Sequence, residues 1–428
     1  MNKLGKNKWT IIILFGLIGQ IAWAIENTEF NLFLFNYVGG SAKDIADMVA
    51  SSSIVATITT LLMGTISDRL GHRGLFLSIG YIMWGISTMA FAFISRENVA
   101  RFVETERVLP VTVMLVIVMD CIMTFFGSTA NDASFNSWVT ETTDVTNRPK
   151  VEGVLNIFPL LSMLIVAGAA GIIIDMTSWP VFFLGTGIIV ILCGILGLFI
   201  IKDEKNEAGK DKKGFFETLL YGFRSDVIKE NSKFYLTLLC LCIFNIAVNT
   251  FMPYLLIYLE KTLGYSVMTY SIVMALVIIV ASIISVLFSS RIDGIGRGKV
   301  LYIAVGMFAL GLALVYFISS PWIFTAVGSF MMTGYVLISI ILSANIRDYT
   351  PRDHVGMFQG IRIIAFVLVP MLIGPYIGSF LTDAISSGTY INSYNEIVNL
   401  PVKEIFVAAA LVSLLIYIPA RKVFKKNA

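Results

Sequence analysis

The sequence has little charge, little histidine and little cysteine, and each shortage excludes a kind of site. Asp, Glu, Lys and Arg make up 14% of the chain, against roughly 25% in an ordinary soluble domain. The chain has two histidines, and none of its four cysteines is spaced with a histidine as metal ligands are. Cysteines inside apolar runs behave as small hydrophobic residues, so the sequence indicates no metal site and no redox role.

Motifs for catalysis are also missing. The sequence shows no paired nucleophile and base and no glycine-rich phosphate loop. The segments between its apolar runs are too short to hold a soluble catalytic domain. We therefore expect neither an enzyme nor a cofactor. The net charge of +3 gives no indication of a nucleic-acid partner, because the basic residues follow a membrane topology.

Long apolar runs dominate what is present. Hydrophobic residues make up 57% of the chain, and the mean hydropathy is +0.83. A membrane-spanning helix needs about 20 apolar residues to cross roughly 30 Å of hydrocarbon. Twelve segments qualify and predict an all-α integral membrane protein with spans over residues 10–36, 46–66, 74–94, 111–138, 151–174, 180–201, 234–259, 267–289, 299–319, 321–346, 356–381 and 404–420.

The basic residues predict the orientation of these helices. Lys and Arg concentrate in short loops on the cytoplasmic side. The first apolar run is too long for a cleavable signal peptide and lacks a small-residue cleavage site, so we expect it to be retained. We predict that both termini are cytoplasmic, which puts these short-loop residues inside: Arg69, Arg73, Arg148, Lys150, Arg291, Arg297, Arg347 and Arg352.

A charged segment divides the chain once. Lys202–Lys213 is charged and helix-poor, and Phe215, Leu219 and Phe223 then recur at helical spacing. This pattern predicts an amphipathic helix in the inner interface, with a regulatory docking segment as the alternative. We predict an amino-terminal six-helix bundle over residues 1–201, a cytoplasmic linker over 202–232 and a carboxy-terminal six-helix bundle over 233–428.

The two predicted bundles share a short motif. Gly64–Arg73 lies between the second and third apolar runs and combines an acid, a tight-turn glycine and basic residues. The acid and the glycine recur 225 residues later at Asp293 and Gly296, and the basic residues Arg297 and Lys299 follow. Such a repeat indicates a duplicated membrane protein built from two parallel halves.

The first copy resembles the signature loop of the major facilitator superfamily. The resemblance implies two pseudo-symmetric six-helix bundles around a central cavity, with the solute bound near the midplane. It implies a secondary active transporter that works by alternating access, and a bacterial inner membrane as its location. Because one chain contains both halves, we expect a monomer.

The motif predicts a gate at the cytoplasmic face. Gly71 permits a tight reversal after the helix that contains Gly64. Asp68 can accept hydrogen bonds from the amino terminus of a neighbouring helix, and Arg69 and Arg73 can pair with acids or lipid phosphates. We predict that these contacts stabilise the outward-facing state. The alternative is that the arginines only set topology and that Asp68 caps a turn.

Polar residues inside the spans are the candidates for solute binding and coupling, because a charge at bilayer depth is costly and usually lines a cavity. Glu26 and Asp132 are the candidates for cation coupling, and we expect partial exposure of Glu26 to an outer vestibule. Thr129, Asp132 and Asn136 share one stripe at α-helical spacing. Arg362 either reaches the inner interface or turns toward Asp132. The candidate solute contacts from the spans are Asn27, Asp132, Asn136, Asn249, Tyr254, Gln359 and Arg362. For each residue alone, an interhelical hydrogen bond is the alternative.

Two stretches resemble the glycoside–pentoside–hexuronide cation symporters: Asp132–Trp138 with Asp144 and Arg148, and Asp348–Tyr349 with Gly356 and Gly360. The resemblance implies that Asp132 serves cation and sugar together, and that Asn156 replaces the family's helix-5 arginine in the solute site. The family's two helix-2 acids fall here near Ala56 and Thr60. Without these two acids, a sodium site of the family's kind is not expected. A proton is favoured as the coupling ion, because burial favours the protonated form of a carboxyl.

Three functions from different classes remain open. The first is cation-coupled symport of a sugar or glycoside, with a proton as the coupling ion and sodium as the alternative. The second is proton-coupled efflux of amphipathic or other small molecules, which the 18 Met and 31 Phe would suit. The third is a membrane sensor or enzyme, which the missing motifs argue against. In the first two, the partners are a small solute and the lipid bilayer.

Overall fold

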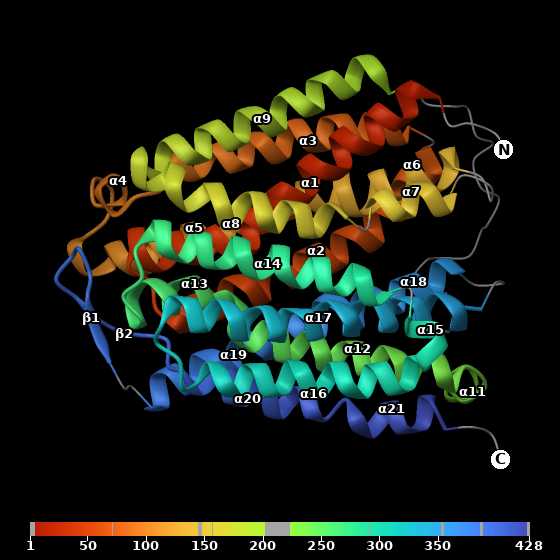
Figure 1. Ribbon diagram of the computed structural model, residues 1–428. Helices are drawn as coiled ribbons and strands as arrows, with labels where there is room; N and C mark the ends of the chain where they lie inside the picture. Colours follow the sequence, from red (N-terminus) through yellow and green to blue (C-terminus); the bar gives the residue numbers. More distant parts are fainter. Residues whose placement is uncertain are drawn as a thin grey trace. The chain divides into compact units, whose positions relative to one another are not determined.

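The computed structural model is almost entirely helical (Figure 1). By contact, the chain forms two compact units. Unit 1 comes from the first half of the chain together with Asn392–Glu396, and unit 2 comes from the second half together with Ser41–Ala50. The structure describes residues 5–70, 72–143, 148–155, 157–201, 223–289, 291–351, 355–385 and 388–425.

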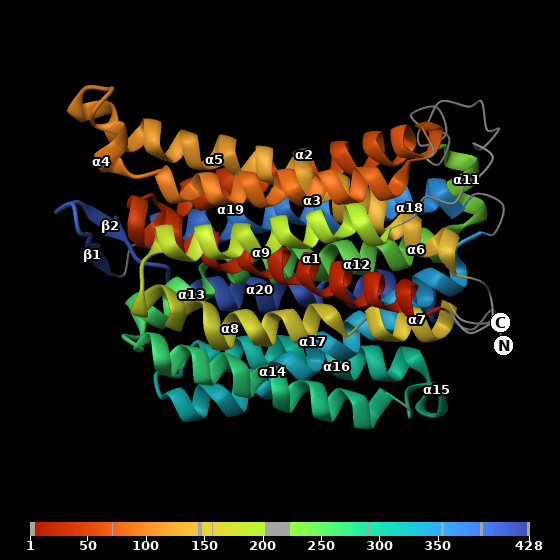
Figure 2. The same ribbon diagram turned by 90° about the horizontal axis from the view of Figure 1, so that it is seen from above.

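The long helices of unit 1 lie side by side, in red to yellow in Figures 1 and 2. The unit contains α1 (Lys6–Leu32), the π-helix η1 (Phe33–Val38), α2 (Ala42–Leu70) from Ser51 onward, α3 (Arg73–Ala90), η2 (Phe91–Phe93), α4 (Arg96–Val99), η3 (Thr105–Arg107), α5 (Val108–Gly127), the π-helix η4 (Ser128–Phe135), α6 (Asn136–Thr142), α7 (Arg148–Leu155), α8 (Phe158–Met176) and α9 (Trp179–Ile200).

Unit 2 repeats this construction. The predicted amphipathic helix falls outside the described residues, apart from Phe223. The unit contains α11 (Ser225–Glu230), α12 (Ser232–Phe251), η5 (Met252–Tyr254), α13 (Leu255–Ile257), the π-helix η6 (Tyr258–Thr262), α14 (Val267–Ser289), α15 (Ile292–Ile295), α16 (Arg297–Val315), α17 (Pro321–Tyr349), α18 (Val355–Ile363), the π-helix η8 (Ile364–Leu368), α19 (Val369–Ile385), β1 (Thr389–Ile391), β2 (Ile397–Asn399), α20 (Glu404–Leu414) and α21 (Tyr417–Val423).

Twelve helical segments among the described residues are long and apolar enough to cross a membrane, which confirms the predicted number. The fourth differs most from its prediction, since it covers Thr105–Thr142 instead of 111–138. The two ends of this segment are polar, so a prediction based on apolar runs does not include them. Side chains on the outside of these helices are exposed, for example Val286 at 69% and Leu287 at 66%. Exposed apolar surface of this extent is what a lipid environment requires.

Four spans contain a π-helical stretch in the described part of the chain, and the sequence did not predict them. η1 and η6 end the first and seventh spans. Each is followed by a glycine with a left-handed backbone, Gly39 at φ 81° and Gly264 at φ 71°. These glycines are 225 residues apart, the same offset as the repeated motif. The duplication therefore extends to backbone conformation, which residue composition does not reveal.

Small residues allow close helix contacts within each unit. In unit 1, a Cβ on Gly85 of α3 would lie 2.5 Å from the carbonyl oxygen of Gly187 in α9. In unit 2, a Cβ on Gly334 of α17 would lie 2.7 Å from the carbonyl oxygen of Ala304 in α16. Close packing of this kind drives helix association in lipid, where the hydrophobic effect between helices is absent.

A two-stranded β-hairpin is the only sheet in the ranges that the structure describes. β1 pairs antiparallel with β2, and Tyr390 lies opposite Val398. The sequence did not predict this hairpin, because three-residue strands are too short to show an alternating pattern. The hairpin lies between α19 and α20, and its turn is Asn392–Glu396.

Candidate functional site

Three acidic side chains converge inside unit 1. Glu26 lies on α1, Asp120 on α5 and Asp132 on η4. Asp120 and Asp132 are both close enough for their charges to act on Glu26. Asp120 is only 2% exposed and Glu26 is also buried, whereas Asp132 is partly exposed. We call these three residues the acidic cluster.

Hydroxyl groups from neighbouring helices contact two of the carboxyls. Thr124, one turn after Asp120 on α5, donates from Oγ1 to Oε1 of Glu26 at 2.9 Å. Ser52 of α2 hydrogen-bonds to Asp120. The second oxygen of each carboxyl, Oε2 of Glu26 and Oδ1 of Asp120, is buried without a hydrogen-bond partner among the described residues. The expected exposure of Glu26 to an outer vestibule is therefore wrong, because its side chain turns toward α5.

The described residues supply no ion-pair partner to the acidic cluster. Within the described ranges, no ion pair includes Glu26, Asp120 or Asp132. Carboxylates this close in a low-dielectric interior repel one another, so they cannot all be ionised without a bound cation. No group of three His, Cys, Asp or Glu side chains in the described residues is placed to hold a metal ion.

The π-helix η4 changes which residues share a face with Asp132. Thr129 is buried and donates from Oγ1 to the carbonyl oxygen of Phe125 at 2.7 Å. Asn136 is exposed, and its amide donates to the backbone oxygen of Asp132 at 3.2 Å. The stripe predicted at α-helical spacing is therefore wrong, because a π-helical turn contains more residues than an α-helical turn.

Tyr81 of α3 fixes η4 against α1. Its hydroxyl donates to the carbonyl oxygen of Phe15 at 2.6 Å and lies 3.3 Å from Oδ1 of Asn131. A Cβ on Gly19 of α1 would lie 2.4 Å from the Tyr81 hydroxyl and 2.5 Å from Oδ1 of Asn131. Asn131 in turn hydrogen-bonds to the carboxyl of Asp132. The missing side chain at Gly19 therefore allows the close approach that positions Asp132.

The sequence did not predict the residues that support the cluster. Thr124 follows Asp120 by four residues, and that helical spacing could have identified it. Ser52 and Tyr81 come from other helices and carry no local signal. Their contacts depend on how the helices pack.

Two of the predicted solute contacts remain open to solvent. Asn27 is exposed on α1, and its amide donates to the carbonyl oxygen of Trp23 at 2.7 Å. Asn249 on α12 is partly exposed, and its amide donates to the carbonyl oxygen of Asn245 at 2.9 Å. In both residues the side-chain amide donates a hydrogen bond within its own helix. A solute contact by either residue stays a prediction.

Tyr254 packs inside unit 2, and its predicted role as a solute contact stays a prediction. It is fully buried, and its hydroxyl donates to the carbonyl oxygen of Pro375 at 2.6 Å. The same hydroxyl lies 3.2 Å from the carbonyl oxygen of Ala42, which also belongs to unit 2. Its polar atom is thus used within the protein.

The remaining candidates of the eleventh span are only partly described. Arg362 is partly exposed on α18, with its guanidinium 5.7 Å from the centroid of the Phe366 ring. Its pairing with Asp132 stays a prediction. The side chain of Gln359 and the whole of Asn156 lie outside the described residues.

The predicted gating motif spans the end of α2 and the start of α3. Gly64 lies within α2, and Arg73 is the first residue of α3. Gly71 and the side chains of Asp68 and Arg69 lie outside the described residues. The gating role of the motif therefore stays a prediction.

Equivalent ion pairs occur at the repeated motif in both units. Arg73 pairs with Glu141 near the end of α6, with an N–O distance of 3.0 Å. Arg297, the first residue of α16, pairs with Asp348 near the end of α17. In each unit, an arginine that begins one long helix thus contacts an acid that ends the next, as a duplication requires.

An apolar groove lies along α5 on unit 1. It has a volume of about 550 Å³ and is lined by Ser51 of α2 and by one face of α5 from Ile117 to Phe126. Cys121, which follows Asp120, is part of this lining. Such a surface suits the hydrocarbon part of a ligand.

Comparisons with known proteins agree with this architecture. The sequence model of the major facilitator superfamily matches residues 11–290 and 237–427. No curated protein matches the chain. A point mutant of the nucleoside transporter NupG has a TM-score of 0.72 at 13% identity, covering 98% of this chain and 100% of that one. A bacterial homologue of the human lysosomal transporter Spinster, in an inward-facing and unoccupied conformation, has a TM-score of 0.69 at 12% identity, covering 99% of each chain.

Likeness at such low identity concerns the fold alone. It confirms the predicted architecture of twelve spans in two six-helix bundles.

Proposed function

The chain belongs to the major facilitator superfamily, and from this premise we propose that it is a proton-coupled symporter of a sugar or glycoside. It is a multi-pass membrane transporter and not an enzyme. The observation that carries the proposal is the acidic cluster, whose carboxyls share no basic partner among the described residues. We further propose that it acts as a monomer in a bacterial inner membrane, with both termini cytoplasmic.

Asp132 is the coupling residue in this proposal. It is the partly exposed member of the cluster, so it can exchange a proton with water in a cavity, while Glu26 and Asp120 are buried. A proton on Asp132 removes one negative charge beside Glu26 and turns a carboxylate acceptor into a group that can also donate. Solute that hydrogen-bonds this protonated carboxyl then travels with the proton. Glu26 and Asp120 keep the local charge negative and so favour proton uptake.

A hydroxyl-rich solute suits the polar groups near the cluster. Carboxyls and amides, such as those of Asp132 and Asn27, form hydrogen bonds with hydroxyls in both directions. The resemblance of Asp132–Trp138 to the glycoside–pentoside–hexuronide symporters supports a sugar. NupG is named as a nucleoside transporter, and a nucleoside also carries a sugar. Nucleosides therefore belong among the solutes to be tested.

The test is counterflow in proteoliposomes that contain the purified protein. Labelled sugars, glycosides and nucleosides are offered singly to vesicles that are preloaded with the same unlabelled compound. We expect accumulation of a sugar or glycoside, and an inward proton gradient should drive its uptake without preloading. Counterflow of no compound in the panel, or uptake that ignores the proton gradient, would reject the proposal.

A second candidate, proton-coupled efflux of an amphipathic molecule, has one observation in its favour. The apolar groove along α5 would suit a hydrocarbon chain. Under this alternative, lipophilic cations and detergents, not sugars, would compete in the counterflow panel.

A further inference from the structure

Trp23 differs from the other tryptophans in its place and its exposure. Three of the six lie among the first four residues of a long helix, where tryptophan is enriched at the membrane–water interface: Trp9, Trp179 and Trp322. Trp84 and Trp138 are buried, with 1% and 5% exposure. Trp23 lies well inside α1 and is only half-buried. It is therefore the tryptophan that a ligand can reach within a span.

The face of α1 around Trp23 is polar and open. Gln20, three residues earlier, is partly exposed, and Asn27, four residues later, is exposed. Residues at these spacings share one face of a helix. The side-chain amide of Asn27 donates to the carbonyl oxygen of Trp23 at 2.7 Å. Because polar side chains at bilayer depth rarely face lipid, this face of α1 is turned to water.

Two neighbours hold the ring of Trp23 in place. Its centroid lies 5.0 Å from that of the Trp84 ring, with 48° between the ring planes. A Cβ on Gly127 of α5 would lie 3.1 Å from Cη2 of Trp23 and 2.9 Å from Cε2 of Trp84. The missing side chain at Gly127 therefore lets both indoles pack on α5. Trp84 also contacts Tyr81, whose ring centroid lies 5.5 Å away.

The polar edge of the Trp23 ring is buried. Its Nε1 has no hydrogen-bond partner among the described residues. Whatever part of the side chain is exposed is therefore carbon. An N–H that is buried without a partner costs free energy, and packing alone does not explain this orientation. Contact between the exposed carbon surface and an apolar surface of a solute would offset the cost.

Trp23 lies close to Asp132, the proposed coupling residue. The hydroxyl of Tyr81, from the same aromatic stack, lies 3.3 Å from Oδ1 of Asn131, and Asn131 hydrogen-bonds to Asp132. On α1, Glu26 follows Trp23 by three residues, and the charge of Asp132 acts on Glu26. An aromatic surface beside a few polar groups is the usual composition of a small-molecule site.

We propose that Trp23 is the stacking surface of the solute site, and that the transported solute therefore has a ring with a flat apolar face. The face of an indole ring carries partial negative charge, which attracts the slightly positive hydrogens on the C–H bonds of a pyranose ring. A nucleobase can stack on the same surface, because every base has a π-face. Open-chain polyols have the hydroxyls but no such face. This role of Trp23 rests on the proposed transport of a hydroxyl-rich solute, and it restricts that solute to cyclic compounds.

The test compares ring compounds with open-chain compounds that carry similar hydroxyls. Equilibrium binding to the purified protein in detergent is measured for two labelled pairs, a methyl hexopyranoside with a hexitol and a nucleoside with ribitol. We expect a ring compound to bind about tenfold more tightly than its open-chain partner, because stacking on one aromatic side chain contributes a difference of this size. The pair that shows the preference identifies the ring.

Variants then assign the preference to Trp23. Trp23→Leu should reduce it about tenfold and leave binding of the open-chain compound unchanged. Trp23→Phe keeps an aromatic face and should retain most of the preference. Gly127→Ala adds a Cβ that displaces both indoles, so it should also weaken the preference. Trp322→Phe, at an exposed position in the first turn of α17, is the matched control and should bind as the unmodified protein does.

A preference of the same size in Trp23→Leu and in the unmodified protein would overturn the proposal. Equal binding of ring and open-chain compounds, or no binding of either, would also overturn it. If Trp23→Leu does not fold, Trp23→Phe and Gly127→Ala still measure the effect.

The binding measurement needs no proton gradient, so it is separate from the test of symport. Proton-driven sugar uptake together with an unchanged preference in Trp23→Leu would leave symport standing and remove the stacking role. A Trp23-dependent preference for the nucleoside alone would support the stacking role and reject a simple sugar as the solute.

Discussion

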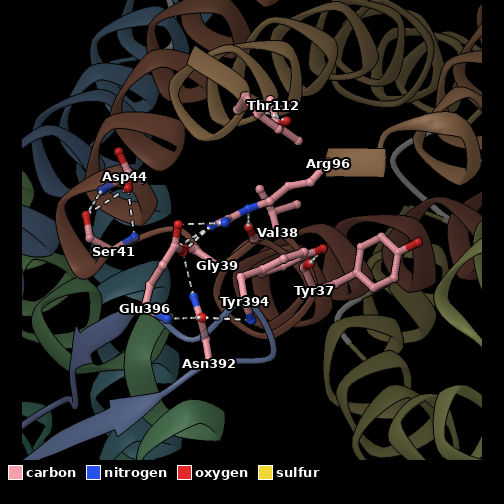
Figure 3. Close-up of polar contacts among 11 residues, drawn as sticks. Tyr37, Val38, Gly39, Ser41, Asp44, Arg96, Thr112, Asn392, Tyr394 and Glu396 are labelled. Carbon is pink, nitrogen blue, oxygen red and sulfur yellow. Dashed lines mark hydrogen bonds and ion pairs between the residues drawn. The ribbon is translucent and has the colours of Figure 1, made fainter. Parts of the chain in front are cut away.

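At the scale of single residues, Gly39 serves both the backbone turn and the packing of the turn Asn392–Glu396 on Arg96 (Figure 3). Arg96 donates from Nη1 and Nη2 to the two carboxylate oxygens of Glu396, at 2.8 Å and 2.7 Å. Its φ of 81° is a conformation that other residues rarely adopt. A Cβ at this position would also lie 2.5 Å from Nη2 of Arg96 and 2.7 Å from Nδ2 of Asn392. The counterpart Gly264 has a similar φ of 71°, but a Cβ there would have no neighbour within 4 Å.

Gly39 and Gly264 therefore separate backbone strain from the packing of the turn Asn392–Glu396 on Arg96. We predict that Gly39→Ala and Gly264→Ala each lower stability by about 1 kcal/mol through backbone strain, and that only Gly39→Ala also raises the fraction of molecules in which the turn is released from Arg96. Thermal unfolding in detergent measures the first effect, and the distance between spin labels on cysteines introduced at the exposed positions Arg101 and Ser393 measures the second. An equal release of the turn in both variants would contradict the prediction.

The coupling role of Asp132 leads to another prediction at this scale. We expect Asp132→Asn to abolish accumulation driven by a proton gradient and to retain counterflow, because an amide can hydrogen-bond solute but cannot bind and release a proton. Asp175→Asn, at the exposed end of α8, is the control and should transport normally. Glu26→Gln should have a smaller effect, since Glu26 is buried. Full accumulation in Asp132→Asn would move the coupling role to another acid.

At the scale of elements, the sequence predicted what depends on composition and missed what depends on packing. Twelve apolar runs are visible because each span must be about 20 residues long and apolar. The π-helix η4 is not visible, since an added residue in a turn leaves the composition unchanged. Asp132 could therefore be identified as a candidate, but its neighbours could not. Asn131 and Tyr81 reach it only because η4 and α3 pack as they do.

The hairpin shows the same limit. Arg96 and Glu396 are 300 residues apart, and each reads as an ordinary loop charge in the sequence. Burial of Arg96 makes the pair specific, and burial follows from the fold. Tyr254 is the opposite case. Its position in an apolar span predicted a solute contact, and in the fold its hydroxyl serves the packing of α19.

The contact between Arg96 and Glu396 in the turn Asn392–Glu396 should weaken in acid. Hydrogen bonds from Arg96 lower the pKa of Glu396, and these outweigh the opposing effect of its partial burial. The docked carboxyl therefore binds a proton more weakly than the released one. Docking is at full strength above the ordinary glutamate pKa of about 4.3, and it weakens as the pH falls through the lowered pKa of the docked form. Arg96 stays charged throughout, and burial raises the pKa of Tyr394, so that group stays neutral.

We predict that the released fraction of the turn is constant from pH 8 to about pH 5 and rises below about pH 4. The spin-label distance measured across this range gives the result. Glu396→Gln should show no such rise, and Glu97→Gln should show it unchanged, which separates the two acids. If the rise disappeared in Glu97→Gln and persisted in Glu396→Gln, the group responsible would be Glu97 of α4.

At the scale of the whole molecule, duplication explains most of the architecture. The left-handed glycines after η1 and η6 and the arginine–acid pairs at α3 and α16 occur once in each half. The acidic cluster breaks this symmetry. In the seventh and tenth spans, which correspond to those of Glu26 and Asp132, acids occur only near the ends, and Asn249 and Asn345 supply amides further in. In these two pairs of spans, acids lie away from the ends only in the first half, and the second half has amides there.

The coupling ion is a property of the whole protein, and the proposed ion is a proton. We predict that, in vesicles without sodium, addition of the transported solute makes the lumen more acidic, as a pH-sensitive dye inside would report. An imposed sodium gradient alone should leave uptake at the level of passive exchange. The Asp132→Asn protein should show solute exchange without acidification. Uptake that requires sodium, with no change in lumenal pH, would show that the acidic cluster binds a metal ion in the working protein and would overturn proton coupling.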